Sequence, residues 1–283
     1  MAAAVDVSGL RKSYGDHEAV RGITFRIEEG EVFCLLGPNG AGKTTTIEIL
    51  EGYRARDAGE VTVLGLDPGR RERTLRERVG VVLQHSETWP QITVGETLKI
   101  YAGYYREPRN VDEVIELVGL VEKRDARIKT LSGGQKRRLD LGLALVGNPD
   151  LVFLDEPTTG FDPQARRNAW EMIRGLRALG KTILLTTHYL DEAQQLADRV
   201  AVLRDGLIVT EGTPAELVAS SHTEIRYREH GEVKVVETDE PTRTLHGLTS
   251  RAVAAGRELE ELEVRRRSLE DVYLDLLHDE DVT

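Results

Sequence analysis

Four short apolar runs recur along the first two-thirds of the chain, and polar stretches separate them. They span residues 32–36, 79–83, 151–154 and 182–186. Continuous apolar runs this short are typical of strands that are buried on both faces, as in a parallel sheet. The pattern therefore predicts four strands at the centre of a sheet that is covered on both sides.

Segments with helical periodicity lie between these runs. We expect helices over residues 43–50, 93–105, 111–118 and 132–145, and one that opens at Asp162-Pro163, an N-cap followed by proline at the first helical position. Strands that alternate with helices predict an α/β fold with a parallel sheet. The long helical stretch at about 93–148 interrupts the alternation and indicates an inserted helical subdomain.

The last 60 or so residues differ in charge and pattern. Residues 221–283 hold 16 acidic and 9 basic side chains, a net charge of −7, whereas residues 1–220 carry only −4. Around residues 225–227 and 233–235, apolar and charged positions alternate as in half-exposed strands, and 251–261 looks helical. Ser268 precedes a carboxylate by three residues, which predicts a capping box and an amphipathic helix. We expect a domain over 1–219 and a small α+β domain over 220–283.

Composition excludes several classes of protein. The 283 residues include one cysteine, Cys34, so neither a disulfide framework nor a cysteine-rich zinc site can form. Aromatic residues make up 5% and the net charge is −11, which argues against a nucleic-acid partner. No apolar run reaches the ~18 residues that a membrane span requires.

A glycine-rich segment after the first apolar run predicts a phosphate site. It reads Gly37-Pro38-Asn39-Gly40-Ala41-Gly42-Lys43-Thr44, with Thr45 next to it. Glycines let backbone N–H groups surround a phosphate, and a helix N-terminus adds positive potential. Lys43 supplies charge to the outer phosphates, and the Thr44 hydroxyl can coordinate Mg²⁺.

Two carboxylates follow the third apolar run. Asp155 stands at the carboxyl end of a predicted strand, where it can hold Mg²⁺ beside the phosphate loop. Glu156 is then placed to act as general base toward the water that attacks the γ-phosphate. A lone Asp-Glu pair is more often a helix cap or a solvated loop charge, and it is the phosphate loop that favours the catalytic interpretation.

A second anion-binding terminus precedes that run. Ser132 caps a predicted helix, and Gly133, Gly134 and Gln135 follow it. One nucleotide does not need two such sites within one chain. Two chains that face each other do, if each supplies this segment to the nucleotide of its partner.

Taken in order, these motifs resemble the ATP-binding subunit of an ABC transporter over residues 5–219. Leu131 to Gln135 matches the signature of that family. The resemblance implies an antiparallel β subdomain beside a P-loop NTPase core. It also implies an adenine-stacking role for Tyr14, a Mg²⁺-sensing role for Gln84 at the transmembrane partner, a cross-dimer role for Asp162 and a γ-phosphate contact for His188. Phe161 stands where the family more often has leucine, a mild departure at the expected interface.

The end of the chain indicates which type of ABC transporter the sequence resembles. Residues 268–274 are similar to the end of ATPase subunits from exporter-type systems, with Tyr273 where phenylalanine is commoner. The resemblance implies an ATPase with ATP and Mg²⁺ as cofactors, a homodimer with ATP at its interface, integral membrane permease subunits as partners, and a place on the cytoplasmic face of the membrane. A soluble ABC ATPase that acts on DNA or the ribosome, and a P-loop kinase or GTPase, are the alternatives. The tail helix can pack on the surface of its own domain, and it can serve dimer contact or regulation; the two roles are compatible.

Overall fold

The computed structural model describes residues 3–82, 89–219, 223–229, 231–266, 269–271 and 273. The chain divides into two compact units, Met1–Glu211 and Gly212–Thr283. This division falls somewhat before the boundary that the charge change indicated at residue 219, and it leaves helix α8 (Pro214–Ala219) with the second unit. Thr213 and Glu216 close a capping box at the start of that helix.

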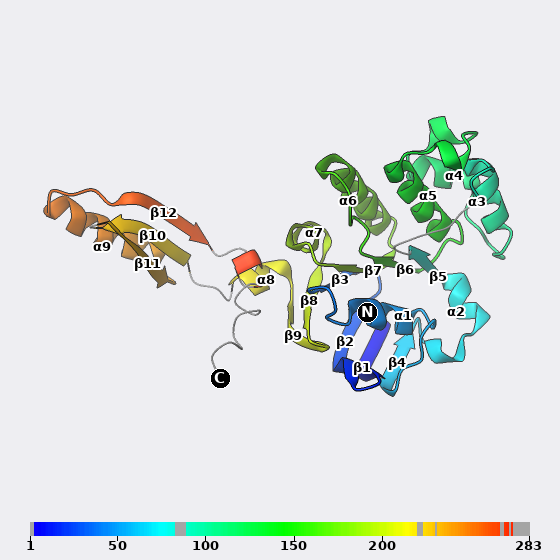
Figure 1. Ribbon diagram of the computed structural model, residues 1–283, viewed down its shortest axis with the longest axis horizontal. Helices are drawn as coiled ribbons and strands as arrows, with labels where there is room; N and C mark the ends of the chain where they lie inside the picture. Colours follow the sequence, from blue (N-terminus) through cyan, green and yellow to red (C-terminus); the bar gives the residue numbers. More distant parts are fainter. Residues whose placement is uncertain are drawn as a thin grey trace. The chain divides into compact units, whose positions relative to one another are not determined.

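A six-stranded sheet forms the centre of the first unit, in the order β5-β6-β7-β3-β8-β9 (Figure 1). Its strands are β3 (Val32–Leu36), β5 (Val79–Val82), β6 (Leu151–Asp155), β7 (Thr182–Thr187), β8 (Arg199–Arg204) and β9 (Leu207–Gly212). From β5 through to β8 every neighbouring pair is parallel. All residues of β3, β6 and β7 are buried, which confirms the prediction for these three apolar runs. The prediction of a fully buried central strand is wrong for β5, which lies at the sheet edge and has only two of its four residues buried.

A second, antiparallel sheet in the order β2-β1-β4 belongs to the same unit. It consists of β1 (Ala3–Tyr14), β2 (His17–Glu28) and β4 (Ala58–Val63). The rings of Phe25 in β2 and Phe33 in β3 stack with centroids 5.4 Å apart, so one apolar core joins the two sheets. This sheet is the antiparallel subdomain that the resemblance implied.

Helices cover both faces of the central sheet. α6 (Pro163–Ala178) and α7 (Leu190–Leu196) lie on one face, whereas α1 (Lys43–Leu50) and the antiparallel sheet lie on the other (Figure 1). The short helices η1 (Pro68–Arg70) and α2 (Arg73–Arg78) precede β5. Strand ends between these two layers therefore carry the loops in which the candidate site lies.

The predicted helical insertion is present beyond strand β5. It contains α3 (Val94–Ala102), α4 (Val111–Leu117), η2 (Val121–Lys123), η3 (Ile128–Thr130) and α5 (Gly133–Leu145). A Cβ at Gly142 in α5 would lie 3.4 Å from Leu98 and from Val114, so the three helices meet at this glycine. A Cβ at Gly80 in β5 would lie 2.4 Å from the carbonyl oxygen of Ala144, which shows how closely α5 packs on the sheet edge.

The second unit is a small α+β structure. Its antiparallel sheet has the order β11-β10-β12, from β10 (Thr223–Glu229), β11 (Glu232–Thr238) and β12 (Glu260–Arg266). Helix α9 (Pro241–Ala254) packs Leu248 against Ile225 and Tyr227 of β10. The two strands predicted around 225–227 and 233–235 are confirmed.

The predicted helix over 251–261 is confirmed only for residues 251–254, the end of helix α9, and is wrong for the rest. Helix α9 begins ten residues earlier in the chain and ends at Ala254, and Gly256 follows with a φ of 64°. Residues 260–266 are strand β12, in which Leu262 and Val264 alternate with charged residues. Because most residues of this segment are charged, its short alternation of apolar and charged positions did not predict a strand. Ser268 of the predicted capping box lies outside the described residues, while Leu269 and Tyr273 are buried.

Within the described part of the chain, no helix combines the length and the apolar character that crossing a bilayer requires.

Candidate nucleotide-binding site

The glycine-rich loop connects β3 to α1 with a backbone that only glycine fits at two points. A Cβ at Gly37 would lie 2.2 Å from the carbonyl oxygen of Leu203, and one at Gly42 would lie 2.3 Å from that of Ala19. Gly42 also has a φ of 101°, in the left-handed region that glycine tolerates best. The loop is therefore shaped by close backbone approaches, and it leads directly into the N-terminus of α1.

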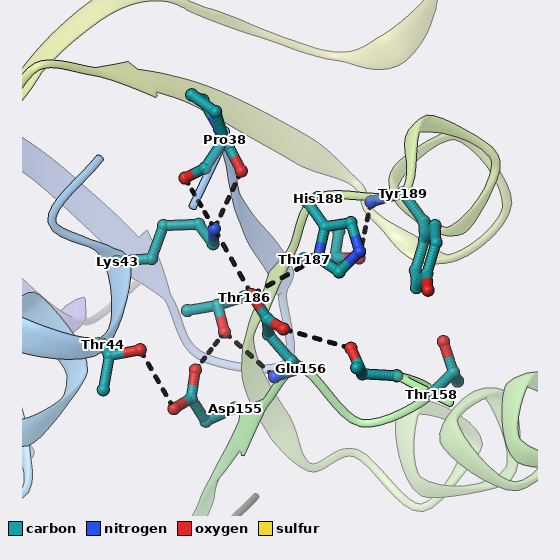
Figure 2. Close-up of polar contacts among 12 residues, drawn as sticks. Pro38, Lys43, Thr44, Asp155, Glu156, Thr158, Thr186, Thr187, His188 and Tyr189 are labelled. Carbon is teal, nitrogen blue, oxygen red and sulfur yellow. Dashed lines mark hydrogen bonds and ion pairs between the residues drawn. The ribbon is translucent and has the colours of Figure 1, made fainter. Parts of the chain in front are cut away.

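Lys43 is the first residue of α1 and is 4% exposed. Its Nζ donates to the carbonyl oxygens of Gly37 (2.8 Å) and Pro38 (3.0 Å) and lies 3.4 Å from Oε1 of Glu156 (Figure 2). The ammonium group is thus held over the loop, on the side where β6 and β7 end.

Asp155 ends strand β6 and is also nearly buried. Its two carboxylate oxygens accept hydrogen bonds from the hydroxyls of Thr44 (3.3 Å) and Thr186 (Figure 2). Thr44 and Asp155 come from elements far apart in sequence, and the parallel arrangement of β3 and β6 brings them together. Two hard oxygen donors side by side at a phosphate loop suit Mg²⁺, which is usually held by one or two protein oxygens plus phosphates and water.

Among the residues that the structure describes, no group of three or more His, Cys, Asp or Glu forms a metal site by itself. An ion at Thr44 and Asp155 would thus depend on the phosphates for its remaining ligands, which agrees with this donor set.

Glu156 adopts a left-handed backbone conformation, with a φ of 45°. Its N–H donates to the Thr186 hydroxyl (3.0 Å), and its Oε2 accepts from the hydroxyl of Thr159 (3.1 Å). Oε1 lies 3.4 Å from Nδ1 of His188 and 3.4 Å from Nζ of Lys43 (Figure 2). Burial alone would raise the pKa of Glu156, but Lys43, Thr159 and His188 outweigh it and hold the pKa below its usual range. Glu156 is therefore a carboxylate at neutral pH.

Lys43, Thr44, Glu156 and His188 line one cavity of about 580 Å³, and Asp155 lies behind Thr44 outside its lining. Its walls include Tyr14, Asn39, Gly40, Gly42, Lys43, Thr44, Thr45, Glu156 and His188 from the sequence prediction, together with His17, Ala19 and Thr159. The volume lies within the usual range for small-molecule sites. The last three residues were missed because no motif marks them: two come from strand β2, and Thr159 follows the carboxylate pair.

Tyr14 stands at the rim of this cavity and is 40% exposed. The guanidinium of Arg54 lies 5.1 Å from its ring centroid and Nζ of Lys12 lies 5.6 Å away. An exposed aromatic ring beside a phosphate loop offers a surface for a nucleobase.

The segment at 132–135 lies elsewhere in the unit. Ser132 and Gln135 form a capping box at the start of α5, and Asp162 caps α6 by accepting from the N–H groups of Gln164 and Ala165. Ser132, Gly133, Gly134 and Asp162 line a separate cavity of about 420 Å³ and do not border the phosphate-loop cavity. One chain therefore does not bring the two predicted anion-binding segments together.

The predicted site residue Gln84 lies outside the described residues.

The fold and this cavity define a P-loop nucleotide-binding protein. Comparisons with known proteins identify the family within this class. The family profile of ABC transporters matches residues 20–159. A "Nod factor export ATP-binding protein I" from Paraburkholderia xenovorans is 47% identical over 223 residues, which cover 77% of this chain and 73% of that protein. A protein of the same name from a Rhizobium species is also 47% identical, over 76% of this chain and 72% of the relative.

Solved structures agree with the sequence relatives. An ATP-binding cassette of an ABC transporter in its ADP conformation has a TM-score of 0.68 at 26% identity, over 76% of this chain and 93% of that one. The cbiO1 protein of Clostridium perfringens, part of the ABC transporter complex cbiONQ, has a TM-score of 0.70 at 28% identity, over 77% and 92%. An ATP-binding subunit of an ABC transporter shares the fold over 97% of this chain at 23% identity and a TM-score of 0.72.

This chain belongs to the ABC transporter ATP-binding family. It is an ATP-binding cassette, the ATP-hydrolysing subunit type that dimerises and acts with transmembrane subunits.

Proposed function

We propose that this chain powers export of a substrate by forming a homodimer that closes on two ATP molecules and pulls on separate integral membrane subunits. The observation that carries the catalytic part is the position of the Glu156 carboxylate, 3.4 Å from both Lys43 Nζ and His188 Nδ1. The direction of transport is supported by the names of the relatives, which are export ATP-binding proteins.

Each site residue then has a defined task. The loop from Gly37 to Gly42 surrounds the phosphates with backbone N–H groups, Lys43 neutralises the outer phosphates, and Tyr14 stacks on adenine. Thr44 and Asp155 hold Mg²⁺, which when bound offsets phosphate charge. Gln84 keeps its predicted role as a sensor of that ion at the transmembrane partner.

Hydrolysis requires a water molecule that is oriented toward the γ-phosphate. Glu156 is ionised and faces the cavity, so it can accept a proton from that water as general base. His188, whose Nδ1 lies beside the same carboxylate oxygen, would contact the γ-phosphate. Lys43 contacts both the loop and Glu156. When phosphate binds, the ammonium group of Lys43 pairs with the nucleotide instead of with the Glu156 carboxylate.

The signature segment supports the dimer. A Cβ on Gly133 or on Gly134 would meet nothing within 4 Å, so this chain's own packing does not require glycine at either position. Glycines that the packing of their own chain does not require are suited to a surface that a second molecule approaches closely. In a head-to-tail dimer, Ser132 to Gln135 and Asp162 of one copy meet the nucleotide of the other. Membrane subunits provide the pathway for the substrate, and the dimer lies on the cytoplasmic face of the membrane.

Replacement of the base tests this function. We expect Glu156→Gln to bind ATP and to lose turnover by ~10²–10⁴-fold, the usual contribution of a general base. In sedimentation, the variant is expected to accumulate as an ATP-bound dimer, because the closed dimer reopens only after ATP is hydrolysed. Turnover within a few-fold of the parent would contradict the assignment of Glu156.

A further inference from the structure

A buried acidic residue lies outside the nucleotide cavity. The buried ionisable side chains among the described residues include Lys43 and Asp155, which belong to the phosphate site, and Glu192, which does not. Glu192 belongs to helix α7 and has no exposed surface. Burial raises the pKa of Glu192, against the opposing effect of Thr187, Thr158 and Trp170 around it. Burial of this carboxylate is costly, so its hydrogen-bond partners indicate which parts of the fold it holds together.

Its carboxylate connects three parts of the fold. Oε1 accepts a hydrogen bond from the hydroxyl of Thr158 (2.9 Å) and another from the indole Nε1 of Trp170 (3.1 Å). Thr158 is fully buried and stands two residues after Glu156, whereas Trp170 lies in helix α6. The loop that carries the proposed base is therefore attached through Glu192 to both α6 and α7.

The histidine segment is held by the same two helices. The rings of His188 and Tyr189 lie 4.1 Å apart, and the guanidinium of Arg166 in α6 lies 4.2 Å from the Tyr189 centroid. Arg166 also pairs with Asp191 at 3.2 Å. The Thr187 hydroxyl accepts from the N–H of Tyr189 (3.0 Å), which fixes the turn after β7. Both Glu156 and His188 thus lie on segments that contact helices α6 and α7.

We propose that Glu192 is a positioning residue for hydrolysis: by accepting hydrogen bonds from Thr158 and Trp170 it holds the Glu156 loop against helices α6 and α7, the same helices that support the His188 turn. It does not line the nucleotide cavity, so it acts through the base and not beside it. The proposal rests on the roles given above to Glu156 and His188. Asp162, at the proposed dimer interface, caps helix α6, so the same contact relays the state of that interface to the base.

The chemistry of the contact determines the variants. Both partners of Oε1 are donors, so the position requires an acceptor oxygen and not a negative charge. Glu192→Gln keeps a carbonyl oxygen at nearly the same place. Glu192→Leu has a similar size but leaves the buried hydroxyl of Thr158 and the partly buried indole N–H of Trp170 without a partner, which is the costly outcome. Gln195→Leu is the matched control, because it removes the exposed hydrogen bond between Gln195 and Arg174 on the same two helices.

Steady-state ATP hydrolysis by the full chain is the first measurement. We expect Glu192→Leu to lower kcat by ~10²-fold, the loss that a displacement of about 1 Å causes in a positioned group. KM for ATP should change little, because Glu192 does not line the cavity. Glu192→Gln and Gln195→Leu should retain a kcat close to that of the parent. A Glu192→Leu variant that only melts at a lower temperature, with kcat unchanged, would overturn the proposal.

Trp170 offers a second measurement. The chain has two tryptophans, so Trp89→Phe leaves Trp170 as the sole reporter of the contact. Addition of ATP and Mg²⁺ should change its emission in this background, and Thr158→Val, which removes the donor next to the base, should abolish that change and lower kcat. An unaltered response together with an unaltered kcat in Thr158→Val would refute the coupling even if Glu192→Leu fails to fold. If Glu156→Gln also hydrolyses ATP normally, the proposed function is wrong. If the Glu192 and Thr158 variants hydrolyse ATP normally but Glu156→Gln does not, only this inference is wrong.

Discussion

Glu51, the residue that follows helix α1, gives the sharpest prediction about stability. It lines a cavity of about 600 Å³ together with Tyr53, Tyr101 and Tyr105. Burial, the charge of Asp155 and the charge of Glu48 raise its pKa from 4.5 to about 8. The folded protein therefore keeps a proton on Glu51 that the unfolded chain releases above about pH 4.5. By linkage, the free energy of unfolding falls as the pH rises through the interval from about 5 to about 8.

The size of the effect follows from that interval. At about 1.4 kcal/mol for each pH unit, the separation between 4.5 and about 8 sets a ceiling of about 5 kcal/mol. Glu51 is partly exposed to the cavity, and screening reduces the effect, so we expect about 2 kcal/mol. Glu51→Gln removes the titrating group, and its advantage over the parent should be absent near pH 5 and complete above pH 8. In a unit of this size, about 2 kcal/mol corresponds to about 4–8 °C in Tm.

Thermal denaturation of the parent and of Glu51→Gln at pH 5 and pH 8.5 checks this reasoning. Glu72→Gln, in the wall of the same cavity, controls for the loss of one negative charge at this surface. A Tm difference between Glu51→Gln and the parent that is equal at both pH values would refute the argument, since only a titrating carboxyl makes the difference depend on pH.

Two further predictions concern the nucleobase and the second unit. Tyr14→Ala should raise the Kd for ATP, because stacking on an aromatic ring contributes ~1–3 kcal/mol per base, and should reduce discrimination between ATP and GTP; fluorescent-nucleotide titration measures both, and an unchanged Kd would assign Tyr14 to packing alone. Deletion of residues 221–283 should leave a folded ATP-binding unit, since every described site residue precedes that point, but should weaken dimerisation or coupling to the membrane subunits. Sedimentation with ATP in a Glu156→Gln background tests the deletion, and equal dimer fractions with normal stimulation by membrane subunits would show that the second unit has neither role.

The phosphate site was predictable because its constraints are local. A fully buried strand before Gly37 and a helix after Lys43 leave few conformations for the loop, and the close approaches at Gly37 and Gly42 confirm that glycine is required there. Asp155 and Glu156 were found for a related reason, since they stand at the end of an apolar run whose place in a parallel sheet the sequence already indicated.

Other features depend on contacts that no local pattern encodes. His17 and Thr159 reach the cavity only because β2 and the loop after Glu156 fold against the phosphate loop. The contact of Glu192 with Thr158 and Trp170 joins residues from three elements, and none of the three has a distinctive neighbour in sequence. In the second unit, strand β12 was not predicted, because only Leu262 and Val264 alternate there among charged residues.

The most direct test of the account is complementation between two inactive chains. The central claim is that the signature segment of one copy completes the nucleotide site of the other. Lys43→Ala disables the phosphate loop and Ser132→Arg disables the signature, so neither homodimer should hydrolyse ATP. In a mixed dimer, the phosphate loop of the Ser132→Arg chain faces the intact signature of the Lys43→Ala chain. The account predicts that mixing the two purified variants restores ATP hydrolysis, and a mixture that stays as inactive as its components, although mixed dimers are present, would contradict it.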